Sequence, residues 1–203
     1  MAGEIYIVAT PIGNLADISA RALEVLRRVD VILCEDTRVT KKLLSRYEIS
    51  TPTRSFHAHS SPRVMREILS LIENGQNVAL VTDAGTPCIS DPGGKLVEAV
   101  YETIPDADII PIPGASAVIA DLSVCVYLSN NFTFVRFKHK KKERNKYFEQ
   151  VAASPVTVAF YESNHRIKKT LGQLAEVLEP HRGVCIMREL TKKFEEVVRV
   201  EAR

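Results

Sequence analysis

The sequence predicts an α/β protein of two α/β domains with largely parallel sheets. Short runs rich in β-branched and apolar residues alternate along the chain with segments whose apolar residues recur at helical spacing. Several of these runs are apolar throughout, which is typical of strands that are covered on both faces. The segment Pro111–Gly114 contains two prolines and a glycine and interrupts the alternation. We therefore expect one domain over residues 1–112 and a second over residues 113–203.

In the first domain, Asp17 is expected to cap a helix that runs to about Arg28, because its carboxylate can accept hydrogen bonds from free backbone amides. Ser60-Ser61-Pro62 is expected to open a later helix, with proline in the first turn and Gly75 just past the end. A further helix is expected near Lys95–Thr103. The expected strands are Glu4–Ala9, Val29–Cys34, Asn77–Thr82 and Asp108–Ile112.

The second domain is expected to follow the same pattern. Because strands that alternate with helices form βαβ units, both sheets should be largely parallel. Ligands bind such sheets beyond the carboxyl ends of the strands, so functional residues are expected in the loops that follow the strands. The expected helices are Ala115–Cys125, Glu143–Ala153 and Ile167–Leu178, and the expected strands are Phe132–Phe137, Val156–Tyr161 and Gly183–Glu189.

The composition is that of a globular protein, with 203 residues of which 45% are hydrophobic and 26% charged. No apolar run approaches the length of a membrane-spanning helix, and the N-terminus lacks the features of a signal peptide, so a cytoplasmic location is expected. His57 and His59 have no third ligand in view, and no metal site is expected. The cysteines are scattered, which argues against a disulfide framework; they are Cys34, Cys88, Cys125 and Cys185.

One segment is strongly basic although the net charge is only +2. Between residues 136 and 146, seven basic residues face one acidic residue, so this segment carries +6 and the rest of the chain −4. Charge runs are usually solvated surface, but this one is flanked by aromatic residues, which favours contact with a phosphate backbone. The basic residues are Arg136, Lys138, Lys140, Lys141, Lys142, Arg144 and Lys146.

The loop Thr82–Gly94 is the most informative part of the sequence. It contains three glycines, two prolines and two aspartates between an expected strand and an expected helix. Such a composition gives a shaped backbone surface rather than an ordinary connection. Neither the Gly-x-x-x-x-Gly-Lys nor the Gly-x-Gly-x-x-Gly pattern occurs in the chain, so the common nucleotide-binding fingerprints are absent.

Other strand ends carry polar groups with two interpretations. Asp36 or Thr37 can simply cap the next helix, and Arg38 can simply pair with Glu35 or Asp36. Alternatively, Arg38 grips a phosphate or carboxylate with its guanidinium. His165 similarly is either a base or a capping residue.

Taken together and in chain order, the loops resemble those of the bacterial small-subunit ribosomal RNA cytidine 2′-O-methyltransferases, members of the tetrapyrrole methylase-like superfamily. The resemblance covers nearly the whole chain. The motifs that carry it are Ala9-Thr10-Pro11-Ile12-Gly13-Asn14-Leu15, Glu35-Asp36-Thr37-Arg38, Asp83-Ala84-Gly85-Thr86-Pro87 with Ser90-Asp91-Pro92-Gly93, Pro113-Gly114-Ala115-Ser116-Ala117, Tyr161-Glu162-Ser163 with His165-Arg166, and Arg188-Glu189-Leu190-Thr191-Lys192.

The resemblance implies a homodimeric enzyme that holds S-adenosylmethionine in a cleft between its two domains and methylates a cytidine ribose in ribosomal RNA. The residues that it implies for cofactor binding are Pro11, Asp83, Gly85, Thr86, Pro87, Ile89, Ser116, Ala117 and Tyr161. The 2′-hydroxyl is a weak nucleophile that benefits from a base or a cation, and the candidates are Glu35, Asp36, Arg38, His165, Glu189 and Lys192. For contact with RNA phosphates, the candidates are Arg38, Arg136, Lys138, Lys140, Lys141, Lys142, Arg144 and Arg166.

The sequence departs from the family pattern in three places. Val126-Tyr127-Leu128 stands where the family has Gly-Leu-Pro, and Arg136-Phe137-Lys138-His139 stands where it has Gly-Phe-Leu-Pro. Family members also continue past Arg188–Lys192 with a further strand and helix, which implies an incomplete second domain here. Two alternatives therefore stand beside RNA methylation: a small-molecule methyltransferase of the tetrapyrrole type, and a non-catalytic RNA- or ribosome-binding relative.

Overall fold

The computed structural model describes residues 1–127, 129–135 and 144–202, and the chain divides into two compact units, Met1–Ser116 and Ala117–Arg203. This division falls four residues after the predicted domain boundary. That the two units are separate domains stays a prediction. Each unit is described by itself below. Among the described residues, no helix is both long and apolar enough to cross a membrane.

The first unit is built on a five-stranded sheet in the order β3-β2-β4-β1-β5, and every neighbouring pair is parallel. This confirms the predicted parallel α/β architecture. The strands are β1 (Ile5–Val8), β2 (Val31–Cys34), β3 (Thr53–Ser55), β4 (Val78–Leu80) and β5 (Ile109–Ile112), and the helices are α1 (Ala20–Arg28), α2 (Thr37–Arg46), α3 (Pro62–Glu73) and α4 (Gly93–Thr103).

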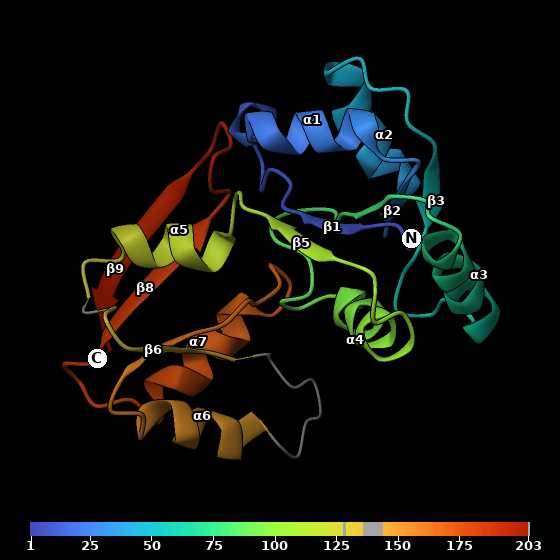
Figure 1. Ribbon diagram of the computed structural model, residues 1–203. Coiled ribbons are helices and arrows are strands. Elements are labelled where there is room, and N and C mark those ends of the chain that lie inside the picture. The colour runs from blue at the N-terminus through green and yellow to red at the C-terminus, as the bar shows by residue number, and fades with distance from the viewer. Residues whose placement is uncertain (128, 136–143, 203) are drawn as a thin grey trace. The chain divides into compact units, whose positions relative to one another are not determined.

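The order of the strands decides which face each helix covers. The chain moves in one direction along the sheet from β1 to β2 to β3 and in the other direction from β3 to β4 to β5. Because crossovers between parallel strands are right-handed, reversing the direction places the helices on the opposite face. Accordingly, α1 and α2 lie on one side of the sheet and α3 and α4 on the other (Figure 1).

Two apolar clusters fill the space between the sheet and these helices. Alternate residues of β1 belong to different clusters: Tyr6 packs with Leu26 of α1, and Ile5 packs with Ile72 of α3. This alternation follows from the two-residue period of a strand. Both faces of the sheet are therefore buried, as the uninterrupted apolar runs predict.

Two predicted helix starts have different outcomes. Ser61 caps α3 through its hydroxyl and Pro62 is the first helical residue, as predicted. The predicted cap of α1 by Asp17 is wrong, because Asp17 lies in a short 3-10 turn and the Ser19 hydroxyl accepts from the Ala22 amide at 3.1 Å. Ser19 is the residue directly before the helix and has an extended backbone. Only a side chain at this position reaches the free amides of the first turn, and Asp17 lies two residues too early.

The second unit contains two separate two-stranded sheets. β6 (Phe132–Phe134) and β7 (Thr157–Ala159) are parallel, whereas β8 (Gly183–Arg188) and β9 (Glu196–Glu201) form an antiparallel hairpin. Neither β9 nor β3 is among the strands expected from the sequence. Part of the predicted strand Phe132–Phe137 and the predicted helix start at Glu143 lie outside the described residues. The helices are α5 (Ala117–Val124), α6 (Arg144–Ala152) and α7 (Ile167–Ala175).

Candidate functional site

The point where the sheet of the first unit changes direction lies between β1 and β4. These strands are neighbours, but the chain leaves β1 toward α1 on one face and β4 toward α4 on the other. Such a switch point is where open α/β sheets bind ligands. The two loops meet there, because Thr10 and Gly85 exchange backbone hydrogen bonds of 2.9 and 3.0 Å.

Further hydrogen bonds fix the loop that follows β4. The Thr10 hydroxyl donates to the Thr82 carbonyl at 3.0 Å, and the Thr86 hydroxyl donates to the Ala115 carbonyl at 3.0 Å. Gly85 has a φ of +88°, a left-handed conformation that favours glycine. These contacts join the loops after β1, β4 and β5 at one edge of the sheet.

Small residues bring the backbones of these loops close together. A Cβ atom on Gly114 would lie 2.9 Å from the Cβ of Ala9, so the loop after β5 approaches β1 more closely than a larger residue allows. The predicted cofactor residues Pro11, Gly85 and Pro87 are buried in this framework. Ile89, in contrast, is 57% exposed and offers an apolar surface. Of the others in this unit, Thr86 and Ser116 are half-buried and Asp83 is exposed.

The segment after β2 forms a compact charged group. Asp36 caps α2, since its Oδ1 accepts from the Arg38 backbone amide at 2.8 Å. The Arg38 guanidinium also donates to both oxygens of Asp36, at 3.0 Å and 2.7 Å. Hydrogen bonds from Arg38 lower the pKa of Asp36 to about 2. Both simple structural interpretations of this motif are therefore confirmed, and the Arg38 side chain remains 87% exposed at the surface.

This charged group is connected to the loop after β4. The Thr82 hydroxyl donates to Oε1 of Glu35 at 2.5 Å, and the Asp36 backbone amide donates to Oδ1 of Asp83 at 3.1 Å. The candidates Glu35, Asp36 and Arg38 thus lie beside the predicted cofactor loop. Thr10 and Thr82 hold these loops, although they were not singled out as site residues; both lie in or beside the recognised motifs.

The loop after β4 also has an internal cap that sequence reasoning did not assign. The Asp91 carboxylate accepts from the Cys88 amide at 2.8 Å and from the Gly93 amide at 2.7 Å. Cys88 has a φ of +71°, which is uncommon for a residue with a side chain. Burial raises the pKa of the Cys88 thiol to about 11, so this thiol is protonated at neutral pH.

In the second unit, Tyr161 contacts the start of α5. Its hydroxyl accepts from the Val118 backbone amide at 3.2 Å, and its ring packs edge-on against Phe134 with centroids 5.0 Å apart. Burial raises the pKa of Tyr161. Ala117 is the first residue of the same helix. Two of the predicted cofactor residues therefore lie at one place in this unit.

A buried polar network follows β7. Burial by itself would raise the pKa of Glu162, but hydrogen bonds from Thr170, the Ser163 amide and Arg166 outweigh it and lower that pKa. The Arg166 guanidinium donates to Glu162 at 2.8 Å, and the Thr170 hydroxyl donates to it at 2.7 Å. Arg144 donates to the same Thr170 at 3.1 Å. Glu162 lies in one of the recognised motifs, whereas nothing in the sequence pattern pointed to Thr170.

The remaining candidates for RNA contact and for catalysis have different surroundings. Arg144 is only 7% exposed, and its hydrogen bond to Thr170 connects α6 to α7. Its contact with an RNA phosphate stays a prediction, and this structural role competes with it. His165 is exposed, and Lys192 donates to Glu189 at 3.2 Å. The predicted residues Arg136, Lys138, Lys140, Lys141 and Lys142 lie outside the described part of the chain.

Comparison with known proteins places the chain in a family. The sequence profile of the tetrapyrrole (corrin/porphyrin) methylases matches residues 4–203. Curated relatives named ribosomal RNA small subunit methyltransferase I are 42% identical over 198 residues in Bacillus subtilis and 45% identical over 195 residues in Mesorhizobium japonicum. These matches cover 97% and 95% of this chain but 67% and 65% of the relatives. The chain therefore spans about two thirds of their length.

Solved structures share the fold at low sequence identity. The methyltransferase CobJ superposes with a TM-score of 0.73 at 19% identity, covering 99% of this chain and 87% of that one. A uroporphyrin-III C-methyl transferase from Thermus thermophilus, complexed with S-adenyl homocysteine, gives a TM-score of 0.67 at 15% identity, covering 98% of this chain and 89% of that one. The predicted fold is confirmed by these matches.

Proposed function

The chain belongs to the tetrapyrrole (corrin/porphyrin) methylase family, and from that premise we propose that it transfers a methyl group from S-adenosylmethionine to the 2′-hydroxyl of a cytidine in small-subunit ribosomal RNA. The observation that carries this proposal is the similarity of nearly the whole chain to curated small-subunit ribosomal RNA methyltransferases, at 42% and 45% identity. Structures with tetrapyrrole-type substrates in their names are 15–18% identical and support the fold alone. RNA is therefore favoured over a macrocycle.

The residues at the β1/β4 switch point fit the proposed cofactor. The loops there expose the apolar side chain of Ile89, and the left-handed Gly85 and the close approach of Gly114 to Ala9 leave little side-chain bulk. In this proposal Pro11, Gly85 and Pro87 shape the surface that holds the adenosyl and methionyl parts. When bound, S-adenosylmethionine supplies an activated methyl group, and most of the rate enhancement comes from positioning.

Glu35 is the carboxylate that we place beside the hydroxyl that is methylated. A base is most effective when its pKa lies near the working pH, and the pKa of about 2 makes Asp36 a poor acceptor. Asp36 instead holds Arg38, whose exposed guanidinium can bind an RNA phosphate in bidentate fashion. Glu189, Lys192 and His165 remain candidates from the second unit.

The basic segment is proposed to bind RNA phosphates, and this role has a direct test. Replacing Lys138, Lys140, Lys141 and Lys142 with glutamine should weaken RNA binding and reduce its salt dependence. The logarithmic slope should fall by about 0.7 for each phosphate of a single strand that the chain no longer neutralises. An unchanged slope would remove the segment from the RNA interface. The resemblance also implies a homodimer, which sedimentation of the purified chain tests, and a cytoplasmic location remains part of the proposal.

The proposed activity is tested by incubating the chain with S-adenosylmethionine that is tritiated in its methyl group. Three acceptors are compared: intact small ribosomal subunits from cells lacking the corresponding enzyme, free small-subunit RNA, and a uroporphyrin-III-type macrocycle. We expect transfer to the subunits or RNA, and a loss of about 100-fold or more in Glu35→Gln but not in the exposed control Glu24→Gln. Transfer to the macrocycle alone would contradict the proposal. Calorimetric binding of the cofactor without transfer to any acceptor would favour the non-catalytic alternative.

A further inference from the structure

The outer side of helix α2 consists mostly of basic side chains. The helix contains four basic residues and no acidic one, and the residues that it buries are Thr40, Leu43 and Leu44. It is therefore amphipathic, with its apolar side buried and a net charge of +4 at the surface. The four basic residues, all of them exposed, are called the α2 face below: Arg38, Lys41, Lys42 and Arg46.

The α2 face belongs to the basic side of the first unit. The helices on that side of the sheet, α1 and α2, contain seven basic residues and one acidic residue (Figure 1). The helices on the other side, α3 and α4, contain three basic and four acidic residues. Arg27 of α1 extends the basic surface to the end of α2, where its guanidinium donates to the Tyr47 carbonyl at 3.1 Å. A surface with one sign of charge attracts a partner of the opposite sign.

Most of the charge on the α2 face has no partner within the first unit. Arg38 pairs with Asp36, but Lys41, Lys42 and Arg46 form no ion pair with any residue that the structure describes. Arg38, Lys42 and Arg46 also follow one another at intervals of four residues, so like charges are neighbours on the helix. Such pairs destabilise a helix, whereas acidic residues at these intervals would stabilise it. The arrangement is therefore unfavourable for the chain alone and becomes favourable when a polyanion binds.

We propose that the α2 face binds the phosphate backbone of the RNA substrate, in addition to the basic segment of residues 136–146. This inference rests on the proposed function. α2 begins within the Glu35–Arg38 motif, where the Asp36 amide donates to Oδ1 of Asp83 at 3.1 Å, and it extends about 15 Å from there. Intervals of four residues separate successive cations by about 6 Å along the helix, so one strand can contact several of them. RNA on this face would lead away from the proposed reaction site.

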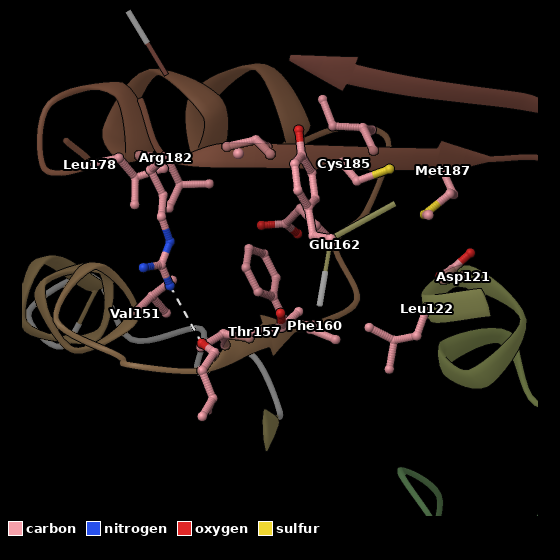
Figure 2. A pocket seen from close by; sticks show the side chains of 18 of the residues that line it. Asp121, Leu122, Val151, Thr157, Phe160, Glu162, Leu178, Arg182, Cys185 and Met187 are labelled. Carbon is pink, nitrogen blue, oxygen red and sulfur yellow. Dashed lines mark hydrogen bonds between the residues drawn. The ribbon is translucent and has the colours of Figure 1, made fainter. Parts of the chain in front are cut away.

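The large cavity of the second unit is a poorer place for a phosphate backbone. Its volume is about 890 Å³, and its walls are largely apolar, with Phe160 and Met187 among the side chains that Figure 2 shows around it. The carboxyl groups of Asp121 and Glu162 also line it and would repel phosphate. Arg182 is the one basic residue among its described lining residues, and its guanidinium already donates to two backbone carbonyls.

Two other anionic partners fit the α2 face less well than RNA. Helices that bind membrane surfaces insert apolar side chains below the headgroups. Within α2, which the structure describes in full, Val39 is the only exposed apolar residue, at 38%. An acidic protein would use the charge equally well, but the position of the helix beside the proposed reaction site favours RNA.

Two triple variants test the proposal in titrations with a single-stranded RNA of mixed sequence. The α2 variant carries Lys41→Gln, Lys42→Gln and Arg46→Gln. The control variant, altered on the opposite side of the sheet, carries Arg63→Gln, Arg66→Gln and Lys95→Gln. At 0.7 for each of three phosphates, the slope of log K against log salt should fall by about 2 in the α2 variant and by less than about 0.5 in the control. A slope that falls equally in both variants, or in neither, would overturn the proposal.

Chemical modification locates the RNA without any substitution. An N-hydroxysuccinimide ester of acetic acid acetylates exposed lysines, and mass spectrometry of peptides measures the rate at each one. At saturation, RNA should slow the acetylation of Lys41 and Lys42 by about fivefold or more and leave that of Lys95 unchanged. Equal slowing at all three lysines, or none, would overturn the proposal. Poly-glutamate that binds more tightly than RNA and protects the same two lysines would contradict RNA and identify an acidic protein as the partner.

Methyl-transfer kinetics distinguish this inference from the proposed function. Because the α2 face contacts the RNA away from the methyl group that is transferred, the α2 variant should raise KM for RNA more than it lowers kcat. Methyl transfer by the parent chain with the same KM in the α2 variant would overturn the α2 face alone. RNA binding that depends on the α2 face without any methyl transfer would support the α2 face and contradict the proposed activity. A parent chain that neither binds nor methylates RNA would overturn both.

Discussion

Thr10 and Gly85 exchange both of their backbone hydrogen bonds, at 2.9 and 3.0 Å, although they are 75 residues apart in the chain. This pairing ties the loop after β1 to the loop after β4 at the switch point of the sheet. It requires Gly85 to hold a φ of +88°, which a residue with a Cβ atom adopts at a cost. The proposed cofactor surface therefore depends on one glycine conformation.

Gly85→Ala should accordingly lower stability by about 1–2 kcal/mol and weaken S-adenosylmethionine binding. The space around an added Cβ is adequate, with Ile12 at 3.5 Å, so the cost arises from the backbone rather than from a clash. Urea unfolding and calorimetry measure the two effects. Gly172→Ala is the matched control, because Gly172 lies inside α7 with open space around it and should gain about 0.5–1 kcal/mol. Unchanged cofactor binding in Gly85→Ala would remove this loop from the cofactor site.

Val126 is a β-branched residue held in a left-handed conformation, with a φ of 63°. Glycine adopts this conformation without the steric cost of a Cβ atom, so it suits this position better than valine. Val126→Gly should raise stability by about 0.5–1 kcal/mol, because the strain it removes exceeds the entropy that glycine adds to the unfolded chain. Val200→Gly in β9 should have the opposite effect, since glycine weakens a strand. A fall in the free energy of unfolding for Val126→Gly would contradict the strain argument.

The Asp121 carboxyl should make stability depend on pH. Burial raises its pKa from 3.8 to about 6, so the folded state binds a proton more readily than the unfolded state between these values. The charged carboxylate therefore destabilises the fold at pH 7, and this penalty disappears as the pH falls through 6 toward 4.

Asp121→Asn should consequently be more stable than the parent chain at pH 7.5 and equally stable near pH 4. Urea unfolding at several pH values measures the difference. The control Asp106→Asn removes the same charge from an exposed loop and should show no such trend. A constant difference across the pH range would mean that the Asp121 carboxyl does not have a raised pKa.

The pKa of the Asp36 carboxyl is lowered by its neighbour Arg38, whereas burial raises that of Asp121. Arg38→Gln removes the largest cause of the lowered pKa, so the pKa of Asp36 should rise from about 2 toward 3.8 in an NMR titration. Because Asp36 serves as a helix cap rather than a base in this account, Asp36→Ser should retain most of the methyl transfer. Complete loss of transfer in Asp36→Ser, with the fold intact, would identify Asp36 as a participant in the reaction.

The sequence predicts the elements that have a strong local signal. The apolar runs of β1, β2 and β4 and the cap formed by Ser61 depend on neighbouring residues and are visible in the pattern. β3 is three residues long and polar, and so it gives no strand pattern. β9 alternates weakly and derives its structure from pairing with β8, a contact that local propensity does not encode.

The candidate site is predictable to a similar extent. Recognisable motifs indicate the loops, but the bonds from Thr82 to Glu35 and from Asp36 to Asp83 depend on which strands become neighbours. Arg144 stands in a basic run, a pattern that predicts a surface residue, yet the packing of α6 on α7 buries it. Residues whose roles depend on tertiary neighbours are therefore those that sequence reasoning assigns least well.

The most direct test of the central claim is mass spectrometry of nucleosides from small ribosomal subunits. Subunits from cells lacking the corresponding enzyme would be incubated with the chain and S-adenosylmethionine and then digested to nucleosides. We expect 2′-O-methylcytidine to appear with the parent chain and to be absent with Glu35→Gln. A methyl group on the base of any nucleoside, or no new modification while calorimetry detects bound cofactor, would contradict the proposed function.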